Sequence, residues 1–210
     1  MSQKVPVGRS VLVKVPATTA NLGPGFDTLG LALSVYDELI VTTRTEPGAT
    51  VDVQGVGAGE VPTDESNLVV RSIAYTFAAY GIDLPGLDLI ARNSIPHGRG
   101  MGSSGAAIVS GIMAAKGLLE GIVEIDSQGL LSLATALEGH PDNVAPALFG
   151  GLTIAWMTPD GPRHKKLIVH RGVSPLVAVP VESIMSTALA RSLQPESVPP
   201  FCTQDLFSQV

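Results

Sequence analysis

The sequence lacks several features that would point to particular classes of protein. One of its 210 residues is cysteine, Cys202, which excludes an internal disulfide and a zinc site built from cysteines. Lysine and arginine number 13 against 19 aspartates and glutamates, which gives a formal net charge of −6. This balance argues against a nucleic-acid-binding surface, and the short basic run Arg163–Lys166 is better explained as a solvated strand or turn.

Long apolar runs are also missing. No stretch approaches the roughly 20 apolar residues that a membrane-spanning helix needs. Near the amino terminus Lys14 interrupts the apolar run Val11–Val13, so no signal-peptide core is present and we expect a cytoplasmic protein. An apolar content of 45% and a charged content of 15% are ordinary for a soluble globular chain. The length suffices for one large domain or two small ones.

The most informative segment that is present, Ile95–Ala106, is typical of a phosphate-binding connection between a strand and a helix. Three glycines within five residues allow a tight turn and bring backbone N–H groups close to an anion. Ser103 and Ser104 follow and are favourable residues for starting the apolar helix that comes next. The N-terminal end of that helix carries the positive end of its dipole, so N–H donors and dipole would face the same anion.

Other interpretations of this loop differ in their spacing requirements. A Walker A loop needs Gly-Lys-Ser/Thr at its end, but the first lysine downstream is Lys116. Gly100, Gly102 and Gly105 satisfy the dinucleotide-binding fingerprint, yet the expected strand before them ends at Ala91 and leaves a polar connector in between. A glycine-rich turn that only caps a buried helix remains a third interpretation of this loop by itself.

A second polar and glycine-rich segment, Lys14–Gly30, follows a clear strand. We expect its residues to form a loop, with Asp27 at the start of a short helix. Such a loop can present Asn21 and Asp27 to a small polar substrate. Each residue also has a purely structural explanation, because aspartate is a frequent helix N-cap and asparagine often bonds within its own loop.

A third segment, Leu137–Gly151, ends a helix and places four polar side chains within six residues. They are Glu138, His140, Asp142 and Asn143. Each by itself is compatible with a capping or solvated role, but three polar loops in one chain favour a composite site.

The periodicity of apolar residues predicts a mixed α and β chain without internal repeats. We expect strands at Ser10–Val15, Glu38–Thr43, Thr50–Gln54, Leu87–Ala91, Gly151–Trp156, Lys166–His170 and Leu176–Pro180. We expect helices at Ser66–Tyr80, Ser104–Gly117 and Ser127–Leu137, with shorter ones after Asp27, Asp142 and Ser186. Pro146 requires the helix after Asp142 to be short or kinked. The pattern predicts two-layer α+β packing.

The three polar segments together resemble motifs of the galactokinase, homoserine kinase, mevalonate kinase and phosphomevalonate kinase (GHMP) superfamily. Pro16–Asp27 is similar to its first motif and Pro96–Ala106 to its second, while Glu138–Pro146 is similar to a segment particular to the homoserine kinase family. The resemblance runs from about Val11 to Gln194. It implies a ribosomal-protein-S5-like N-terminal domain followed by the start of a ferredoxin-like C-terminal domain.

The resemblance implies roles for individual residues. The backbone of the second motif would wrap the phosphates of ATP, through Pro96, His97, Gly98, Arg99, Gly100, Met101, Gly102, Ser103, Ser104, Gly105 and Ala106. Ser104 and Glu138 would be the Mg²⁺ ligands. The substrate would be held by Asn21, Asp27, His140, Asp142, Thr187 and Arg191, and the catalytic candidates are Asp27, Glu138 and Arg191. Whether Asp27 accepts the hydroxyl proton or only orients the substrate stays open. Lys14 is a weaker candidate for a position near the nucleotide.

The implied activity is transfer of the γ-phosphoryl group of ATP to the hydroxyl of L-homoserine, which gives O-phospho-L-homoserine for threonine biosynthesis. The alternatives are a truncated, non-catalytic relative that at most binds nucleotide, and a kinase for another small alcohol. The resemblance implies no nucleic-acid or membrane partner and allows a homodimer.

The resemblance implies an ATP-binding domain at 1–155 and an incomplete second domain at 156–210, whose last ten or so residues depart from the family. A later glycine-rich loop and a later arginine of the family are absent. We therefore expect the 210-residue chain to be nearly inactive and marginally folded, with apolar residues such as 176–179 uncovered.

Overall fold

The computed structural model describes residues 4–179. Their elements follow one another as β1 (Ser10–Leu22), β2 (Gly25–Arg44), β3 (Ala49–Gly55), α1 (Leu68–Ala79), β4 (Gly86–Asn93), α2 (Ser103–Leu118), α3 (Ser127–Glu138), α4 (Val144–Phe149), β5 (Leu152–Thr158) and β6 (Gly161–Leu167). The expected α+β class is confirmed. No helix in this described part is long and apolar enough to cross a membrane.

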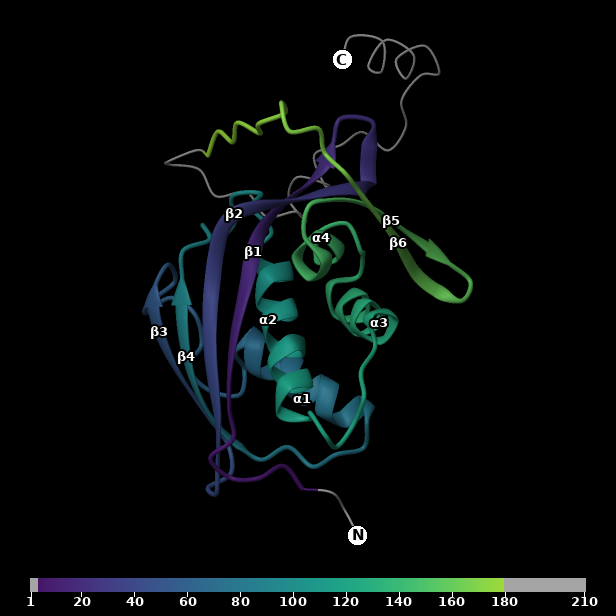
Figure 1. Cartoon of the computed structure of the whole chain (residues 1–210). Helices are drawn as coiled ribbons and strands as arrows, with labels where there is room; N and C mark the ends of the chain where they lie inside the picture. The colour runs from purple at the N-terminus through teal and green to yellow at the C-terminus, as the bar shows by residue number, and fades with distance from the viewer. Residues whose placement is uncertain (1–3, 180–210) are drawn as a thin grey trace, which may run out of the picture.

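The strands form one curved sheet around the long strand β2. Strand β2 has β1 along one side, and on its other side it pairs with β4 through its second half and with β5 through Leu29–Leu31. The order across the sheet is β3-β4-β2-β5-β6, with β1 paired to β2 outside that path. All pairs are antiparallel except β3 with β4. The four helices lie together on one face of the sheet (Figure 1).

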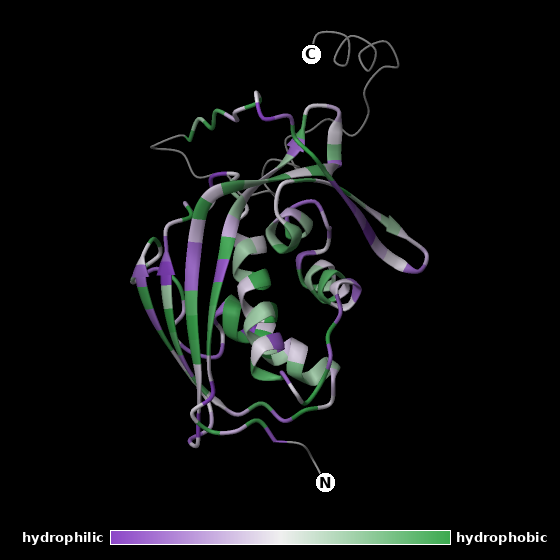
Figure 2. Cartoon of the chain, viewed as in Figure 1, coloured by the Kyte–Doolittle hydropathy of each residue, from purple (hydrophilic) through white to green (hydrophobic). Residues whose placement is uncertain are grey.

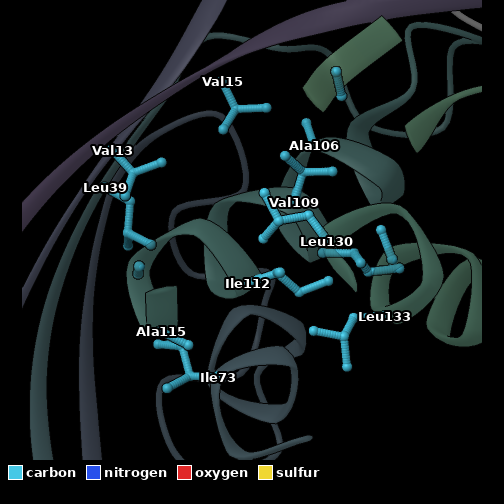
Figure 3. Packing of buried hydrophobic residues seen from close by; sticks show 14 of the residues in the cluster. Val13, Val15, Leu39, Ile73, Ala106, Val109, Ile112, Ala115, Leu130 and Leu133 are labelled. Atoms are coloured by element: carbon cyan, nitrogen blue, oxygen red, sulfur yellow. The ribbon is translucent and has the colours of Figure 1, made fainter. Parts of the chain in front are cut away.

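Helix α2 is the centre of the core because it is apolar on nearly all sides. It packs against α1, β1, α3 and α4, and a helix of this composition is stable only when it is enclosed. Figure 3 shows Val13 and Val15 of β1 facing Ala106 and Val109 of α2. In Figure 2 the strands alternate between hydrophobic and hydrophilic residues, as expected for a sheet with helices on one face. The core thereby holds the N-terminal end of α2 in a defined position.

The expected loop and short helix around Asp27 are wrong. Strand β1 continues to Leu22 and β2 begins at Gly25, so the two strands form a long hairpin through this segment. The physical reason is cross-strand pairing, in register from Thr18 opposite Ala32 to Leu22 opposite Gly25, with irregularities along the way. A ladder with a long partner outweighs the local helical pattern after Asp27.

The last predicted elements agree less well with the structure. The strand expected at 166–170 is in fact β6, Gly161–Leu167, whose register is set by pairing with β5. No strand forms over 174–179, because these residues pair with no neighbouring strand. Leu176 is 98% exposed there, so the expected uncovered apolar side chains are present. Pro180, the helix expected after Ser186 and the final ten residues lie outside the described range.

The other expected helices and strands are confirmed within a few residues at their ends, except that the strands expected at Ser10–Val15 and Glu38–Thr43 are only the outer parts of the longer strands β1 and β2. Helix α4 is short, as Pro146 requires, and this proline lies in its first turn, where no intrahelical N–H bond is lost. The glycine-rich segment forms the connection from β4 to α2. This places it at the N-terminal end of the central helix.

Candidate active site

The glycine-rich loop takes a backbone course that other residues rarely adopt. Gly98, Gly100 and Gly102 have φ of 62°, 69° and 66°. Gly102 is the N-cap of α2 in the left-handed conformation, and no side chain caps the helix. The N–H groups of the first turn of a helix have no intrahelical partner, so they are left for an external acceptor.

Close approach explains why a side chain is excluded at Gly102. A Cβ built there would overlap the hydroxyl oxygen of Thr18, on β1, and would lie 3.1 Å from Oδ1 of Asn143. The backbone N–H of Thr18 also donates to the carbonyl oxygen of Met101 at 3.1 Å. Strand β1 and the residues before α4 therefore press directly on the loop at the start of α2.

Ser104 and Glu138 meet beside this helix end. The Ser104 hydroxyl donates to Oε1 of Glu138 at 2.8 Å, joining the first turn of α2 to the last residue of α3. Burial raises the pKa of Glu138 above its ordinary value, while the Ser104 hydrogen bond and the nearby His140 oppose that rise and Asp142 adds to it. A half-buried carboxylate whose charge is poorly solvated favours the arrival of a cation.

A tight turn after α3 buries the charged group Asp142. Its side chain is 0% exposed, its Oδ1 accepts the backbone N–H of Asn143 at 2.8 Å, and Nδ1 of His140 contacts the same oxygen. Oδ2 has no hydrogen-bond partner among the described residues. A buried carboxylate oxygen without a donor is costly, which makes Asp142 a candidate for contact with a polar ligand.

Thr18 connects this turn to the glycine-rich loop. Its buried hydroxyl donates to Oδ1 of Asn143 at 2.9 Å, while its backbone N–H holds the loop carbonyl described above. The carbonyl oxygen of Asp142 also closely approaches Gly30 on β2, where a Cβ would overlap it. The three segments singled out in the sequence are thus adjacent in space.

Asn21 and Asp27 lie in the hairpin that carries Thr18. Both have positive φ, 58° and 54°, which is uncommon for residues other than glycine. Oδ1 of Asn21 accepts the backbone N–H of Asp27 at 2.8 Å, so Asn21 shapes the end of the hairpin. Asp27 is therefore neither a helix N-cap nor on a helix. Asparagine and aspartate adopt positive φ more readily than other non-glycine residues, so the pair shapes this part of the hairpin.

A largely apolar pocket opens next to the glycine-rich loop. It lies between the sheet and helices α1 and α2, and its polar lining includes Asp37, Asn67, His97 and Ser104. A largely apolar lining with a few polar groups suits a small aromatic ligand. The pocket therefore continues the anion site formed by the loop.

Several predicted residues are not brought into this cluster by the described structure. Thr187 and Arg191 lie outside residues 4–179. Lys14 forms an ion pair with Glu38 at 3.1 Å, with both side chains substantially exposed. Within the described range, no three His, Cys, Asp or Glu side chains form a group that could hold a metal ion by themselves.

Sequence reasoning missed Thr18 and Asp37. Oδ1 of Asp37 accepts the backbone N–H of Ser94 at 2.7 Å and that of Ile95 at 2.9 Å. No pattern marks an aspartate within an alternating strand as the partner of a loop about 57 residues away. Thr18 lies within the quoted first motif, but its contact with Asn143 depends on the folded chain.

Comparisons with known proteins agree with this geometry. Residues 67–151 match the family model described as GHMP kinases N terminal domain. The chain is 80% identical over 192 residues to a homoserine kinase of Leifsonia xyli subsp. xyli, which covers 91% of this chain and 59% of the relative. It is 75% identical over 199 residues to a homoserine kinase of Clavibacter michiganensis subsp. michiganensis, covering 95% and 63%.

A solved structure gives the same result. The crystal structure of homoserine kinase from Cytophaga hutchinsonii matches with a TM-score of 0.75 and 29% identity, over 99% of this chain and 66% of that one. Fold and sequence thus show that the chain contains the N-terminal domain of a GHMP kinase, which the family model matches over residues 67–151. Within the GHMP superfamily it is a homologue of the homoserine kinases. The chain spans about 60% of the length of the curated relatives that it matches.

Proposed function

We propose that the chain provides the nucleotide site and most of the acceptor site of a homoserine kinase, a transferase that phosphorylates the side-chain hydroxyl of L-homoserine. The observation that carries this proposal is the junction of the glycine-rich loop, the Ser104–Glu138 pair and the buried Asp142. The glycine-rich loop and the Ser104–Glu138 pair are suited to a nucleoside triphosphate, and Asp142 is suited to an ammonium group. The names of the relatives support the same activity.

ATP would lie along the loop and in the adjoining pocket. The free N–H groups at the start of α2 and the positively charged helix end suit the phosphates. The largely apolar pocket lined by Asn67 and His97 suits the base and sugar. The backbone of residues 96–106, rather than a lysine, would carry phosphate recognition.

Ser104 and Glu138 are suited to hold Mg²⁺. A hydroxyl and a carboxylate oxygen 2.8 Å apart are hard donors of the kind that this ion prefers. Because no larger acidic cluster is present in the described range, the nucleotide phosphates would supply further ligands. The ion would neutralise charge on the phosphates.

Homoserine carries an ammonium and a carboxylate, and the chain offers a partner for each. Asp142 and its neighbour His140 lie at the base of the acceptor site, with Oδ2 of Asp142 lacking a donor among the described residues. Asn21 and Asp27 approach from the hairpin. Thr187 and Arg191 are assigned to the substrate on the motif resemblance, Arg191 as the carboxylate or phosphoryl partner.

The chemistry would depend mainly on positioning. Phosphoryl transfer needs the acceptor oxygen in line with the γ-phosphorus and stabilised charge on the transferring group, and a strong base is not essential. Asp27 orients the hydroxyl or accepts its proton, the loop N–H groups bind the phosphate oxygens, and Arg191 adds positive charge. Residues 1–155 would form the ATP-binding domain and residues from 156 the start of the second.

Because the purified chain is expected to turn over slowly, the proposal is tested by comparing its rates of ADP release between acceptors. Release that depends on homoserine, and that exceeds release with mevalonate or galactose at least tenfold, supports it. Nucleotide binding in a titration without any turnover supports the alternative of a non-catalytic relative. Turnover of mevalonate or galactose equal to or above that of homoserine contradicts the assignment of Asp142 to an ammonium group.

A further inference from the structure

The glycine-rich loop is held at its beginning by a carboxylate that belongs to neither the loop nor the helix. Asp37, on β2, accepts the backbone N–H groups of Ser94 and Ile95 through one oxygen, at 2.7 and 2.9 Å. These two residues come directly after the end of β4 at Asn93. The pair of bonds therefore fixes the direction in which the chain leaves the sheet to form the loop.

The same loop is held at its far end by the partner strand of that hairpin. The backbone N–H of Thr18, on β1, donates to Met101, and its hydroxyl donates to Asn143. Met101 is buried and immediately precedes the N-cap of α2. Between these two attachments lie Pro96 to Gly100, which include two of the three glycines with positive φ.

A loop of this composition needs external attachments to present its donors in one arrangement. Glycine has more conformational freedom to lose than any other residue, and a loop that orders only on binding loses affinity by that amount. Asp37 stays half-buried even though burial raises its pKa, which the two backbone donors oppose. A carboxylate kept in this environment on an otherwise alternating strand indicates a specific task.

We propose that Asp37 is a positioning residue that preorganises the glycine-rich loop for nucleotide, with Thr18 as the second attachment. Both belong to the β1–β2 hairpin, which also carries Asn21 and Asp27. One hairpin would thus set the phosphate loop and the acceptor side relative to each other. The inference rests on the proposed function in so far as the loop binds nucleotide.

Hydrogen exchange of the protein without nucleotide tests the attachment itself. In Asp37→Ala, exchange should increase at least tenfold at the backbone amides of Ser94 and Ile95, which donate to Asp37, and stay unchanged in α1 and α3. Asp37→Asn keeps an acceptor oxygen in the same place and should restore protection. Asp88→Ala is the matched control, because Asp88 is an exposed carboxylate on β4 that bonds Arg44 and Thr50, on the neighbouring strands.

Titration with Mg·ATP and, separately, with homoserine gives the second readout. Asp37→Ala should weaken nucleotide binding at least tenfold and homoserine binding less than threefold, whereas Asp37→Asn should weaken nucleotide binding less than threefold. Thr18→Val removes the hydroxyl that donates to Asn143 but keeps the backbone N–H that donates to Met101, so it should weaken nucleotide binding less than threefold. An unchanged loop exchange in Asp37→Ala overturns the positioning role.

The two hypotheses fail in different ways. If the unaltered chain binds no nucleotide, the proposed function is wrong, while the exchange experiment still reports whether Asp37 holds the loop. If Asp37→Ala exchanges and binds nucleotide like the unaltered chain, the positioning role is wrong and the proposed function stands. If exchange rises throughout the molecule and Asp37→Asn does not reverse it, Asp37 is a general stability residue and the inference fails.

Discussion

The two halves of the proposed site are built by different means. The phosphate side consists of backbone, in a loop whose glycines have positive φ and whose donors are main-chain N–H groups. The acceptor side consists of side chains, with Asp142 fully buried and its neighbours His140 and Asn143 in direct contact with it. The first depends on the absence of side chains, and the second on their burial.

This difference predicts different responses to substitution. A backbone loop tolerates no added atoms, and its own donors carry no side-chain charge; the side chains of Ser104 and Glu138 beside it act only through the Mg²⁺ that they are proposed to hold. A buried carboxylate tolerates a change of side-chain shape poorly. Neutralising its charge weakens the binding of its ligand. Four substitutions separate the two kinds of site, and their expected effects decrease from Gly102→Val to Glu138→Gln.

Gly102→Val should have the largest effect. The new side chain would meet Thr18 and Asn143 and would need a positive φ that valine avoids. Strain and overpacking of about 1–3 kcal/mol each should together weaken nucleotide binding roughly 100-fold or more. A nucleotide titration measures this loss.

Gly121→Val is the matched control for that substitution. Gly121 lies after the opposite end of α2, has φ of 79° and has open space where a Cβ would be. It carries the backbone strain without the close approach, so it should lower the melting temperature but leave nucleotide affinity within about threefold. Equal losses of nucleotide affinity in both variants would contradict the close-approach explanation.

Asp142→Asn should have the next largest effect, on the other ligand. It removes a buried negative charge whose Oδ2 has no donor among the described residues, while an amide oxygen can still accept the N–H of Asn143. Homoserine binding should weaken about 10- to 100-fold, since hydrogen bonds to charged groups contribute about 1.5–3 kcal/mol. Nucleotide binding should change little.

The melting temperature adds a second readout for Asp142→Asn. Removing an incompletely paired buried charge should leave the ligand-free protein as stable as before or more stable. Asp52→Asn, on the exposed side of β3, serves as the control and should change the binding of neither homoserine nor nucleotide. If Asp142→Asn binds homoserine normally but unfolds more easily, Asp142 is structural and the acceptor site is elsewhere.

Ser104→Ala should have a smaller effect that falls on the nucleotide. It removes one hydroxyl oxygen and the bond to Glu138, a contribution of about 1 kcal/mol. We expect Mg·ATP binding to weaken about fivefold and homoserine binding to stay unchanged. Ser103→Ala, at the neighbouring first residue of α2, is the control. A larger effect on homoserine than on Mg·ATP would argue against a role for Ser104 at the phosphates.

The smallest effect concerns pH and Glu138. Because burial raises the pKa of Glu138, Mg·ATP affinity should start to fall at a higher pH than for an exposed glutamate when the solution is acidified. The Ser104 hydrogen bond lowers this pKa, so Ser104→Ala should shift the acid limb further upward. Mg·ATP titrations from pH 4.5 to 8 measure where the affinity falls on acidification. If this fall occurs at the same pH in Ser104→Ala, the Ser104 hydrogen bond does not affect the pKa of Glu138.

The folding stability of Glu138→Gln tests whether the pKa of Glu138 is raised in the folded protein. A carboxyl group with a raised pKa in the folded state binds its proton more tightly there, so stability falls as the pH rises through the window from its ordinary value to the raised one. At neutral pH, Glu138→Gln should therefore unfold at the same or a higher temperature without ligand, yet bind Mg·ATP more weakly. A large loss of stability would show that the charge of Glu138 supports the fold.

Prediction from sequence succeeded where a residue type has one main physical use. Helices α1 to α4, strands β3, β4 and β5, the outer parts of β1 and β2, and the strand-to-helix position of the glycine-rich loop followed from periodicity and glycine spacing. Prediction failed over residues 16–30, where a helix was expected after Asp27. There the local pattern is outweighed by an antiparallel partner that lies along the whole segment.

The sequence by itself determined which segments form the proposed site. Glycine spacing, first-turn serines and a dense polar turn can each be recognised within a short stretch of residues. The tertiary structure alone decided how they meet. Thr18 touches Asn143 across 125 residues and Asp37 holds a loop 57 residues away, contacts that no local pattern encodes. The reason is that sheet register and core packing around α2 fix these distances, and both depend on the whole folded chain.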